Sequence, residues 1–306
     1  YANMGALTIM NINNLGFQVN NALGAFTTDS AAAGSALATG ESHANRHISA
    51  TVDGQAIPSL SDFFDEKGYA VGVMTLGNVA DATPSAFYGH STERDNADEI
   101  TRYLLDGKLD LLCGSGMREF TSRKDGVDLV GELKKAGYAF ITDASQIDEQ
   151  NGKVICIDER MDEAVEEATL DFLADATRDA IDHLQNQSKK GFFLMIEGSM
   201  IDDGGHDNKA GHTMEEIFDF DKTLGIVLEW AAKDGETLVV VTGDHATGGM
   251  TLLSGSIDEK RIRVNFSTTG HNGIFLPVFA WGPHSEDFVG IYENTELSDR
   301  IRALIR

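Results

Sequence analysis

Cysteine and proline are scarce in this chain. Its 306 residues include two cysteines, Cys113 and Cys156, and four prolines. Two cysteines are too few for a cysteine-based metal cluster or a dense disulfide framework. Each lies in a short apolar run, which favours burial as a small hydrophobic side chain, and a disulfide between them stays open. With few prolines and no break in composition, we expect a single domain over residues 1–306.

Positive charge and long apolar runs are also lacking. The 24 Lys and Arg residues face 49 Asp and Glu residues, so the formal net charge is −25. An acidic surface repels nucleic acids and anionic membranes, which disfavours both as partners. No apolar run reaches the roughly 18 residues that a membrane span requires. The residues from Tyr1 onward show no signal-peptide pattern, and we expect that an upstream segment is missing from this sequence.

Short apolar runs alternate with helical patterns along the chain. This alternation predicts βαβ units, and therefore an α/β fold with a mainly parallel central sheet and helices on both faces. Active sites in such sheets lie beyond the carboxyl ends of the strands. Strands are predicted at 70–74, 109–113, 192–196, 238–242 and 274–281, with 192–196 and 238–242 buried on both faces. Helices are predicted at 59–67, 97–105, 127–136, 161–187 and 214–232.

Ser30 precedes a run of small helix-forming residues that ends near Gly40. Its position predicts a helix start, and the local sequence favours an ordinary N-cap serine. The alternative is a nucleophile whose phosphorylated form is stabilised by the free N–H groups and dipole of the helix N-terminus. The local sequence leaves both interpretations open.

The apolar strand at 192–196 leads directly into Glu197, and Asp202, Asp203 and His206 follow. Three carboxylates and an imidazole at a strand end suit a metal site with oxygen and nitrogen ligands. In a helix, Asp202 and His206 would lie on one face, but the intervening glycines make a loop equally plausible. A solvated acidic loop is the simpler alternative.

A second apolar strand delivers Asp244 and His245 to its carboxyl end. The pair could bind one metal ion together if the backbone bends at Gly243; otherwise it is a polar strand end. His271 precedes the strand at 274–281 and could supply a further nitrogen ligand, although a lone histidine between glycines is usually a turn residue.

The segment from Asp81 to Arg94 follows the strand at 70–74. Thr83 before a proline is a helix-start pattern, so Thr83 could simply be an N-cap. Arg94 could be a surface charge, or its guanidinium could bind two phosphate oxygens at once.

In this order, the motifs resemble those of the alkaline phosphatases. The shared features are Asp-Ser-Ala before an Ala-rich helix, Ala-Thr-Pro followed by an arginine, Glu-Gly-Ser-x-Ile-Asp with a downstream histidine, Thr-x-Asp-His at a strand end, and Gly-His before a Val-Phe-Ala-x-Gly-Pro strand. The ending at 288–296 is also similar to bacterial members. The resemblance covers nearly the whole chain.

The resemblance implies hydrolysis of phosphate monoesters through a phosphoserine, at a site with two Zn²⁺ ions and one Mg²⁺ ion. Ser30 would be the nucleophile, and Asp29 would orient Arg94. The implied ligands are Asp202, His206 and His271 for one zinc, Asp244 and His245 for the other, and Thr83 and Glu197 for magnesium, with Asp81 close to the magnesium site.

Two departures from the family pattern carry expectations. Family members have an aspartate that bridges the second zinc and the magnesium, in a Gly-Asp-Gly-Met-Gly-like strand end. No residue of this sequence matches it, so we expect that an N-terminal strand is missing. Asp203 adds a carboxylate next to a zinc ligand and should weaken phosphate binding. The short connection between His245 and His271 should reduce the crown insertion and open the site.

Other functions remain as alternatives. A phosphodiesterase or sulfatase of the same superfamily is one, and a non-catalytic relic that binds metal or phosphate is another. By analogy with the family, we expect small phosphate monoesters and inorganic phosphate as ligands, a homodimer, and a periplasmic or extracellular location.

Overall fold

The computed structural model describes residues 7–162 and 171–305. The strands in this part of the chain are β1 (Asn14–Val19), β2 (Ala70–Asn78), β3 (Leu111–Ser115), β4 (Ala139–Ile141), β5 (Val154–Ile157), β6 (Phe192–Glu197), β7 (Val239–Thr242), β8 (Ala246–Thr247), β9 (Thr251–Ser256), β10 (Arg261–Asn265), β11 (His271–Asn272), β12 (Leu276–Trp281) and β13 (Gly290–Glu293). The α-helices are α1 (Ser30–Thr39), α2 (Leu60–Glu66), α3 (Ala82–Ala86), α4 (Ala97–Arg102), α5 (Arg118–Thr121), α6 (Leu129–Lys135), α7 (Phe172–Leu184), α8 (Met200–His206), α9 (Ala210–Asp234) and α10 (Thr295–Leu304). Short 3₁₀ turns are η1 (Thr8–Asn11), η2 (Tyr103–Asp106), η3 (Ala144–Gln146), η4 (Glu159–Met161) and η5 (Ser285–Phe288).

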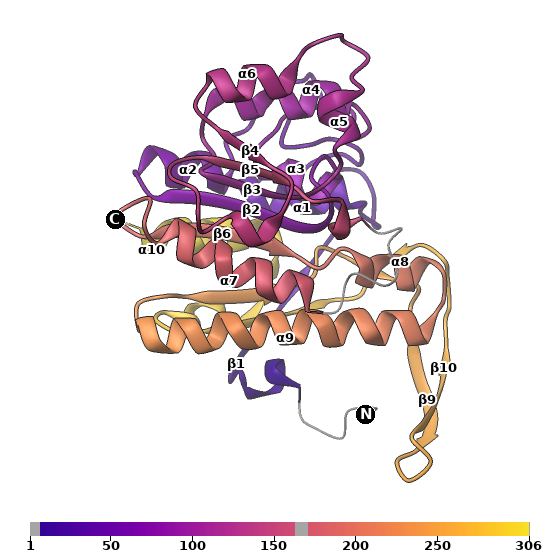
Figure 1. Cartoon of the computed structure of the whole chain (residues 1–306). Coiled ribbons are helices and arrows are strands. Elements are labelled where there is room, and N and C mark those ends of the chain that lie inside the picture. Colours follow the sequence, from indigo (N-terminus) through magenta and orange to yellow (C-terminus); the bar gives the residue numbers. More distant parts are fainter. Residues whose placement is uncertain (1–6, 163–170, 306) are drawn as a thin grey trace.

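A five-stranded sheet in the order β4-β5-β3-β2-β6 forms the centre of the fold, and its paired strands are all parallel. Successive side chains of β3 and β5 enter two different cores, one shared with α2 and the other with α7. This period of two is the expected pattern of a strand covered on both faces. The predicted α/β fold, with a parallel sheet and helices on both faces, is confirmed (Figure 1).

A separate sheet has the order β13-β1-β12-β7 and is mixed, because β12 runs antiparallel to both β1 and β7. Strand β1 was not predicted, and its apolar side is the exposed one: Leu15 and Phe17 are exposed, whereas Gly16 and Gln18 are buried. As predicted, the side chains of 192–196 and 238–241 pack against cores on both faces of β6 and β7, although most of these residues are only half-buried. Within the described residues, β6 pairs only with β2 and β7 only with β12, so each is a sheet edge.

The helices broadly follow the predicted ranges. Helix α9 is longer than expected, while the helix predicted at 161–187 is realised as α7, preceded by η4. Residues 163–170 of that prediction lie outside the described part of the chain. Cys113 and Cys156 are fully buried free thiols, as the buried-hydrophobe interpretation predicts, and lie opposite each other in β3 and β5. No described helix is both long and apolar enough to cross a bilayer.

The connection between His245 and His271 contains the β9–β10 hairpin, which projects from the body of the molecule (Figure 1). The residues of β9 are almost all exposed. At the base of the hairpin, β8 pairs antiparallel with β11, with Thr247 opposite His271. This two-residue ladder brings the segment that follows β7 together with His271.

Candidate active site

Ser30 is the first residue of α1, and Asp29 is its N-cap. Asp29 Oδ1 accepts a hydrogen bond from the backbone N–H of Ala32 at 2.9 Å. The interpretation of Ser30 as the capping residue was therefore wrong, because its neighbour performs that function. The Ser30 hydroxyl is free for another partner and lies 3.0 Å from His245 Nε2. Gly40 ends the helix in the left-handed conformation (φ 85°), as predicted.

Helix α1 packs closely against α3. A Cβ atom on Gly34 would lie 3.3 Å from the Cα of Thr83, so the small residues of α1 permit the contact. Asp81 occupies the N-cap position of α3 and Thr83 lies inside the helix, which contradicts the N-cap interpretation of Thr83. Burial raises the pKa of the Asp81 carboxyl, and the nearby charge of Arg94 opposes that shift.

The turn after β7 places Asp244 and His245 next to Ser30. Asp244 Oδ1 accepts the backbone N–H of His245 at 2.9 Å, which folds the carboxylate back along the chain. Its other oxygen lies 3.2 Å from His245 Nε2, the atom that also approaches Ser30. Two buried amides of the β1 segment support this turn: Gln18 donates to Gly243 O at 2.6 Å and Asn20 donates to Asp244 O at 3.0 Å. The sequence analysis missed both amides.

Asp202 and His206 lie on one face of α8, with Asp202 Oδ2 and His206 Nε2 3.3 Å apart. The loop that the glycines suggested is therefore a helix, and close packing of that helix explains why glycine occurs at these positions. A Cβ on Gly204 would lie 2.7 Å from the backbone N of Thr213 in α9, and one on Gly205 would lie 2.9 Å from Thr247. Helix α8 approaches both neighbours closely only because these side chains are absent.

His206 and His271 face each other through their Nε2 atoms, which are 3.2 Å apart. The Nδ1 atom of His206 lies 2.6 Å from the carbonyl oxygen of Thr269, and that of His271 lies 2.8 Å from that of Thr28. A carbonyl oxygen can only accept, so each Nδ1 must carry the proton and donate it. Both Nε2 lone pairs then point into the same space, with Asp202 beside them.

Asp202 lies at the centre of the cluster. Its Oδ1 atom is 3.8 Å from His245 Nδ1 and 3.8 Å from His271 Nε2, and it accepts a hydrogen bond from the Thr247 hydroxyl. The rings of His245 and His271 stack with centroids 3.5 Å apart. Asp202, His245 and His271 form a group whose ligand atoms lie within 4.8 Å of one another. Thr247, which the sequence analysis missed, lies only two residues after His245.

Glu197 at the end of β6 accepts a hydrogen bond from the Thr75 hydroxyl at 2.5 Å. Removal from water raises the pKa of Glu197 to about 8, and the negative charge of Asp244 adds to that shift, while the hydroxyls of Thr75 and Thr83 oppose it. A carboxyl in this setting takes up its charged form readily only beside a cation. Thr75 is a further residue that sequence reasoning did not find.

Arg94 contacts the site at Asp29. Its Nη1 atom lies 3.4 Å from Asp29 Oδ2, on the capping residue next to Ser30. Asp203 is half-exposed, and its Oδ2 atom lies 3.9 Å from His212 Nε2. Apart from Asp203, the predicted site residues thus come together from α1, α3, α8, β11, the ends of β6 and β7, and the segment between α3 and α4 that carries Arg94.

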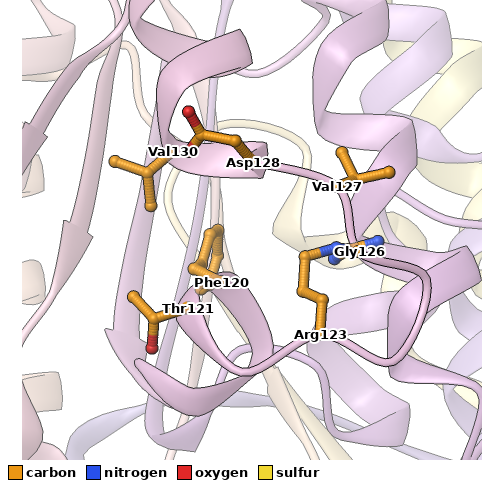
Figure 2. Close-up of a pocket in the computed structure, with 7 residues that line it drawn as sticks. All are labelled: Phe120, Thr121, Arg123, Gly126, Val127, Asp128 and Val130. Carbon is orange, nitrogen blue, oxygen red and sulfur yellow. The ribbon is translucent and has the colours of Figure 1, made fainter.

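A surface pocket of about 440 Å³ is formed elsewhere, at α5, α6 and the segment between them. Figure 2 shows its lining, which includes Arg123 and Phe120 but none of the predicted site residues. The Arg123 guanidinium already donates to Asp125, to the Thr101 hydroxyl and to backbone carbonyls. This pocket therefore offers no free cationic group to a ligand.

The donor atoms of the cluster fit metal ions. Imidazole nitrogens with carboxylate oxygens are zinc ligands, and ligating histidines usually donate their second ring N–H to a carbonyl, as His206 and His271 do. Glu197 and Thr83 offer oxygens only, the preference of magnesium. The two predicted zinc sets lie in one continuous cluster, because Asp202 lies close to both His245 and His206.

Comparisons with known proteins agree with this chemistry. The family model described as alkaline phosphatase matches residues 3–259. Alkaline phosphatase 4 of Bacillus subtilis is 37% identical over 235 residues, which cover 74% of this chain and 50% of that protein. Alkaline phosphatase 3 of the same organism is 30% identical over 354 residues, covering 90% of this chain and 76% of that protein.

Solved structures give the same result. The alkaline phosphatase of the Antarctic bacterium TAB5 superposes with a TM-score of 0.91 at 35% identity, covering 100% of this chain and 92% of that one. A structure of a variant of that enzyme is described as having Mg bound. The matched motifs, the fold and the clustered site residues agree, and the chain belongs to the alkaline phosphatase family.

Proposed function

We propose that this protein hydrolyses phosphate monoesters with Ser30 as the nucleophile. The observation that carries the proposal is the convergence of the His206 and His271 Nε2 atoms with Asp202, close to a serine at a helix start. The chain spans half the length of one matched relative and about three quarters of the other. The activity of those relatives therefore supports the proposal and is carried over as an inference.

Ser30 Oγ attacks the phosphorus atom in line with the ester oxygen. The Ser30 hydroxyl gives up its proton to solvent and the new Oγ–P bond forms as the P–O ester bond breaks, while the leaving oxygen takes a proton from water and departs as the alcohol. Water then cleaves the phosphoserine, which releases inorganic phosphate and restores Ser30. The dipole of α1, which begins at Ser30, stabilises the charge of a phosphoryl group on this residue.

Arg94 binds two phosphate oxygens, and Asp29 orients its guanidinium. The proposed metal set is two Zn²⁺ ions and one Mg²⁺ ion: Asp202, His206 and His271 would hold one zinc, Asp244 and His245 would hold the other, and Thr83 and Glu197 would hold the magnesium. When bound, these ions neutralise charge on the attacking and leaving oxygens. Asp81 tunes the magnesium site from its position at the start of α3.

A serine–histidine–aspartate relay suits the geometry less well. In such a relay the serine and the carboxylate contact different nitrogens of the histidine. Here Ser30 Oγ and Asp244 Oδ2 both approach His245 Nε2, at 3.0 and 3.2 Å. Two oxygens directed at one nitrogen suit a shared cation better than a proton relay.

The test is turnover of an aryl phosphate monoester, compared with a bis-aryl phosphate diester and an aryl sulfate. We expect strong preference for the monoester, and phosphorylated Ser30 in peptides from an acid-quenched reaction. Ser30→Ala should retain bound zinc and lose the phosphopeptide. Preference for the diester or sulfate would favour another enzyme of the superfamily, and bound zinc without turnover would favour the relic.

We further infer a single domain, a homodimer and a periplasmic or extracellular location, all by analogy with the family. The active site is proposed to be open, because the connection between His245 and His271 consists largely of one projecting hairpin (Figure 1). Sedimentation analysis tests the dimer, and relative rates on small and bulky phosphate monoesters test the open site.

A further inference from the structure

Arg46 lies on the surface between α1 and α2, and the sequence analysis gave it no role. Its guanidinium binds two carboxylates: Nε donates to Glu93 Oε2 at 3.0 Å, and Nη2 donates to Glu93 Oε1 and to Asp95 Oδ2. Glu93 and Asp95 are the two neighbours of Arg94 in the chain. The Arg46 side chain therefore binds the residues on both sides of Arg94 in the chain.

The backbone of Arg46 is tied to the same site. Its N–H donates to Asp29 Oδ2 at 2.9 Å, the oxygen that also lies 3.4 Å from Arg94 Nη1. The preceding residue, Asn45, accepts the backbone N–H of Asp29 at 3.0 Å and donates to Thr27 O. The loop at 45–46 therefore contacts both the N-cap of the Ser30 helix and the segment that carries Arg94.

We propose that Arg46 is a positioning residue for Arg94. The inference rests on the proposed role of Arg94 as a phosphate ligand. Glu93 and Asp95 flank Arg94 in the chain, and their negative charges would compete with Asp29 for its guanidinium if they were unpaired. Arg46 occupies both carboxylates with charge-assisted hydrogen bonds, and the bidentate pair with Glu93 also fixes the direction of the segment.

The backbone conformation of Arg46 allows the effect of its side chain to be tested separately from the loop. Arg46 has a φ of 72°, in the left-handed region that glycine adopts most easily. Glycine at this position would relieve the strain and keep the Arg46 N–H to Asp29, while removing the guanidinium. Arg46→Gly therefore separates the effect of the side chain from that of the loop.

The experiment is a double-mutant cycle with Arg46→Gly and Arg94→Ala, read out as the inhibition constant for inorganic phosphate, KM and kcat. We expect Arg46→Gly to raise the inhibition constant and KM by about tenfold, with a smaller change in kcat. In the Arg94→Ala background the same change should have less than about a twofold effect, because no arginine remains to be positioned. Arg46→Lys should recover part of the loss, since lysine supplies charge without the planar fork.

Arg178→Gln is the matched control, because Arg178 pairs with Asp175 on the exposed face of α7 and has no part in the site. If Arg46→Gly has the same effect with Arg94 present and with Arg94→Ala, it acts through its charge alone and the inference is overturned. An unchanged inhibition constant for inorganic phosphate in Arg46→Gly would also overturn it. If Arg94→Ala alone leaves phosphate binding unchanged, the proposed role of Arg94 falls, and this inference with it. Thermal unfolding verifies folding, and Arg46→Gln provides the same test should the glycine variant misfold.

Discussion

The Nε2 atoms of His206 and His271 lie 3.2 Å apart, and the Nδ1–H group of each ring donates a hydrogen bond to a backbone carbonyl. Two nitrogen lone pairs at this distance repel each other unless a proton or a cation lies between them. The folded chain is therefore organised for a positive ion at this point, and the stability of the fold should depend on that ion.

Zinc should stabilise the folded protein against heat. At a free concentration about 1,000 times the dissociation constant, the expected gain in the free energy of unfolding is about 4 kcal/mol. The measurement is thermal unfolding of chelator-treated protein with and without added Zn²⁺. His271→Ala should remove most of the gain, whereas His284→Ala, at an exposed histidine near Asp287, should leave it intact.

Asp29 has two functions that different substitutions can separate. Asp29→Ala removes the cap of α1 and the partner of Arg94, and should lower the free energy of unfolding by about 1 kcal/mol and weaken phosphate binding. Asp29→Asn keeps an oxygen for the cap but loses the charge and the second oxygen, which accepts the Arg46 N–H. It should therefore lose less stability than Asp29→Ala in chemical denaturation while also binding phosphate more weakly; equal stability losses in the two variants would contradict this division.

Asp203 should weaken phosphate binding through its charge. It is half-exposed on α8 beside the proposed ligand Asp202, and its Oδ2 atom lies 3.9 Å from the imidazole Nε2 of His212. Asp203→Lys reverses the charge and should lower the inhibition constant for inorganic phosphate. Glu229→Lys makes the same charge change near the C-terminal end of α9, at a residue paired with Lys233, and should have little effect. An unchanged or higher constant for Asp203→Lys would reject the role.

Gly204 should not tolerate a side chain. A Cβ at this position would lie 2.7 Å from the backbone N of Thr213, so Gly204→Ala must push α8 away from α9. We expect a loss of about 1–3 kcal/mol in the free energy of unfolding and weaker zinc binding. Gly211→Ala is the control, since a Cβ there meets nothing within 4 Å in the first turn of α9. That change should stabilise the protein by about 0.5–1 kcal/mol in the same denaturation experiment.

Asp179 on α7 should make stability depend on pH. Burial, together with repulsion from Asp148 and other carboxylates, raises the pKa of Asp179 to about 6. A raised folded-state pKa favours the protonated acid, so its stabilising contribution is complete below about pH 4 and is lost as the pH rises through about 6. Asp179→Asn should therefore stabilise the protein at pH 7.5, on the order of 1 kcal/mol after solvent screening, and have little effect at pH 4. Urea unfolding at the two pH values measures this, with exposed Asp258→Asn as the control.

Hydrophobic patterning predicted the parallel sheet well, because both faces of its inner strands are covered. The runs around 70–74 and 109–113 became β2 and β3 with side chains in two cores. Side chains of β6 and β7 also pack on both faces, but they are only half-buried, since an apolar run does not report how many neighbours a strand pairs with. Strand β1 was not predicted, and its place in the fold depends on its pairing with β12 and β13.

For the site, residue types and spacing were enough to predict the candidate metal ligands and the strand ends that carry them: Glu197, the Asp202–His206 spacing and the Asp244–His245 pair. Contacts between distant segments were needed to show that Asp29 caps the helix and leaves Ser30 free, and that His206 and His271 share one space. It also revealed Thr75, Thr247 and Arg46 as supports. Local sequence fixes which chemical groups are present and their direction along an element, whereas contacts between distant segments depend on how the elements pack.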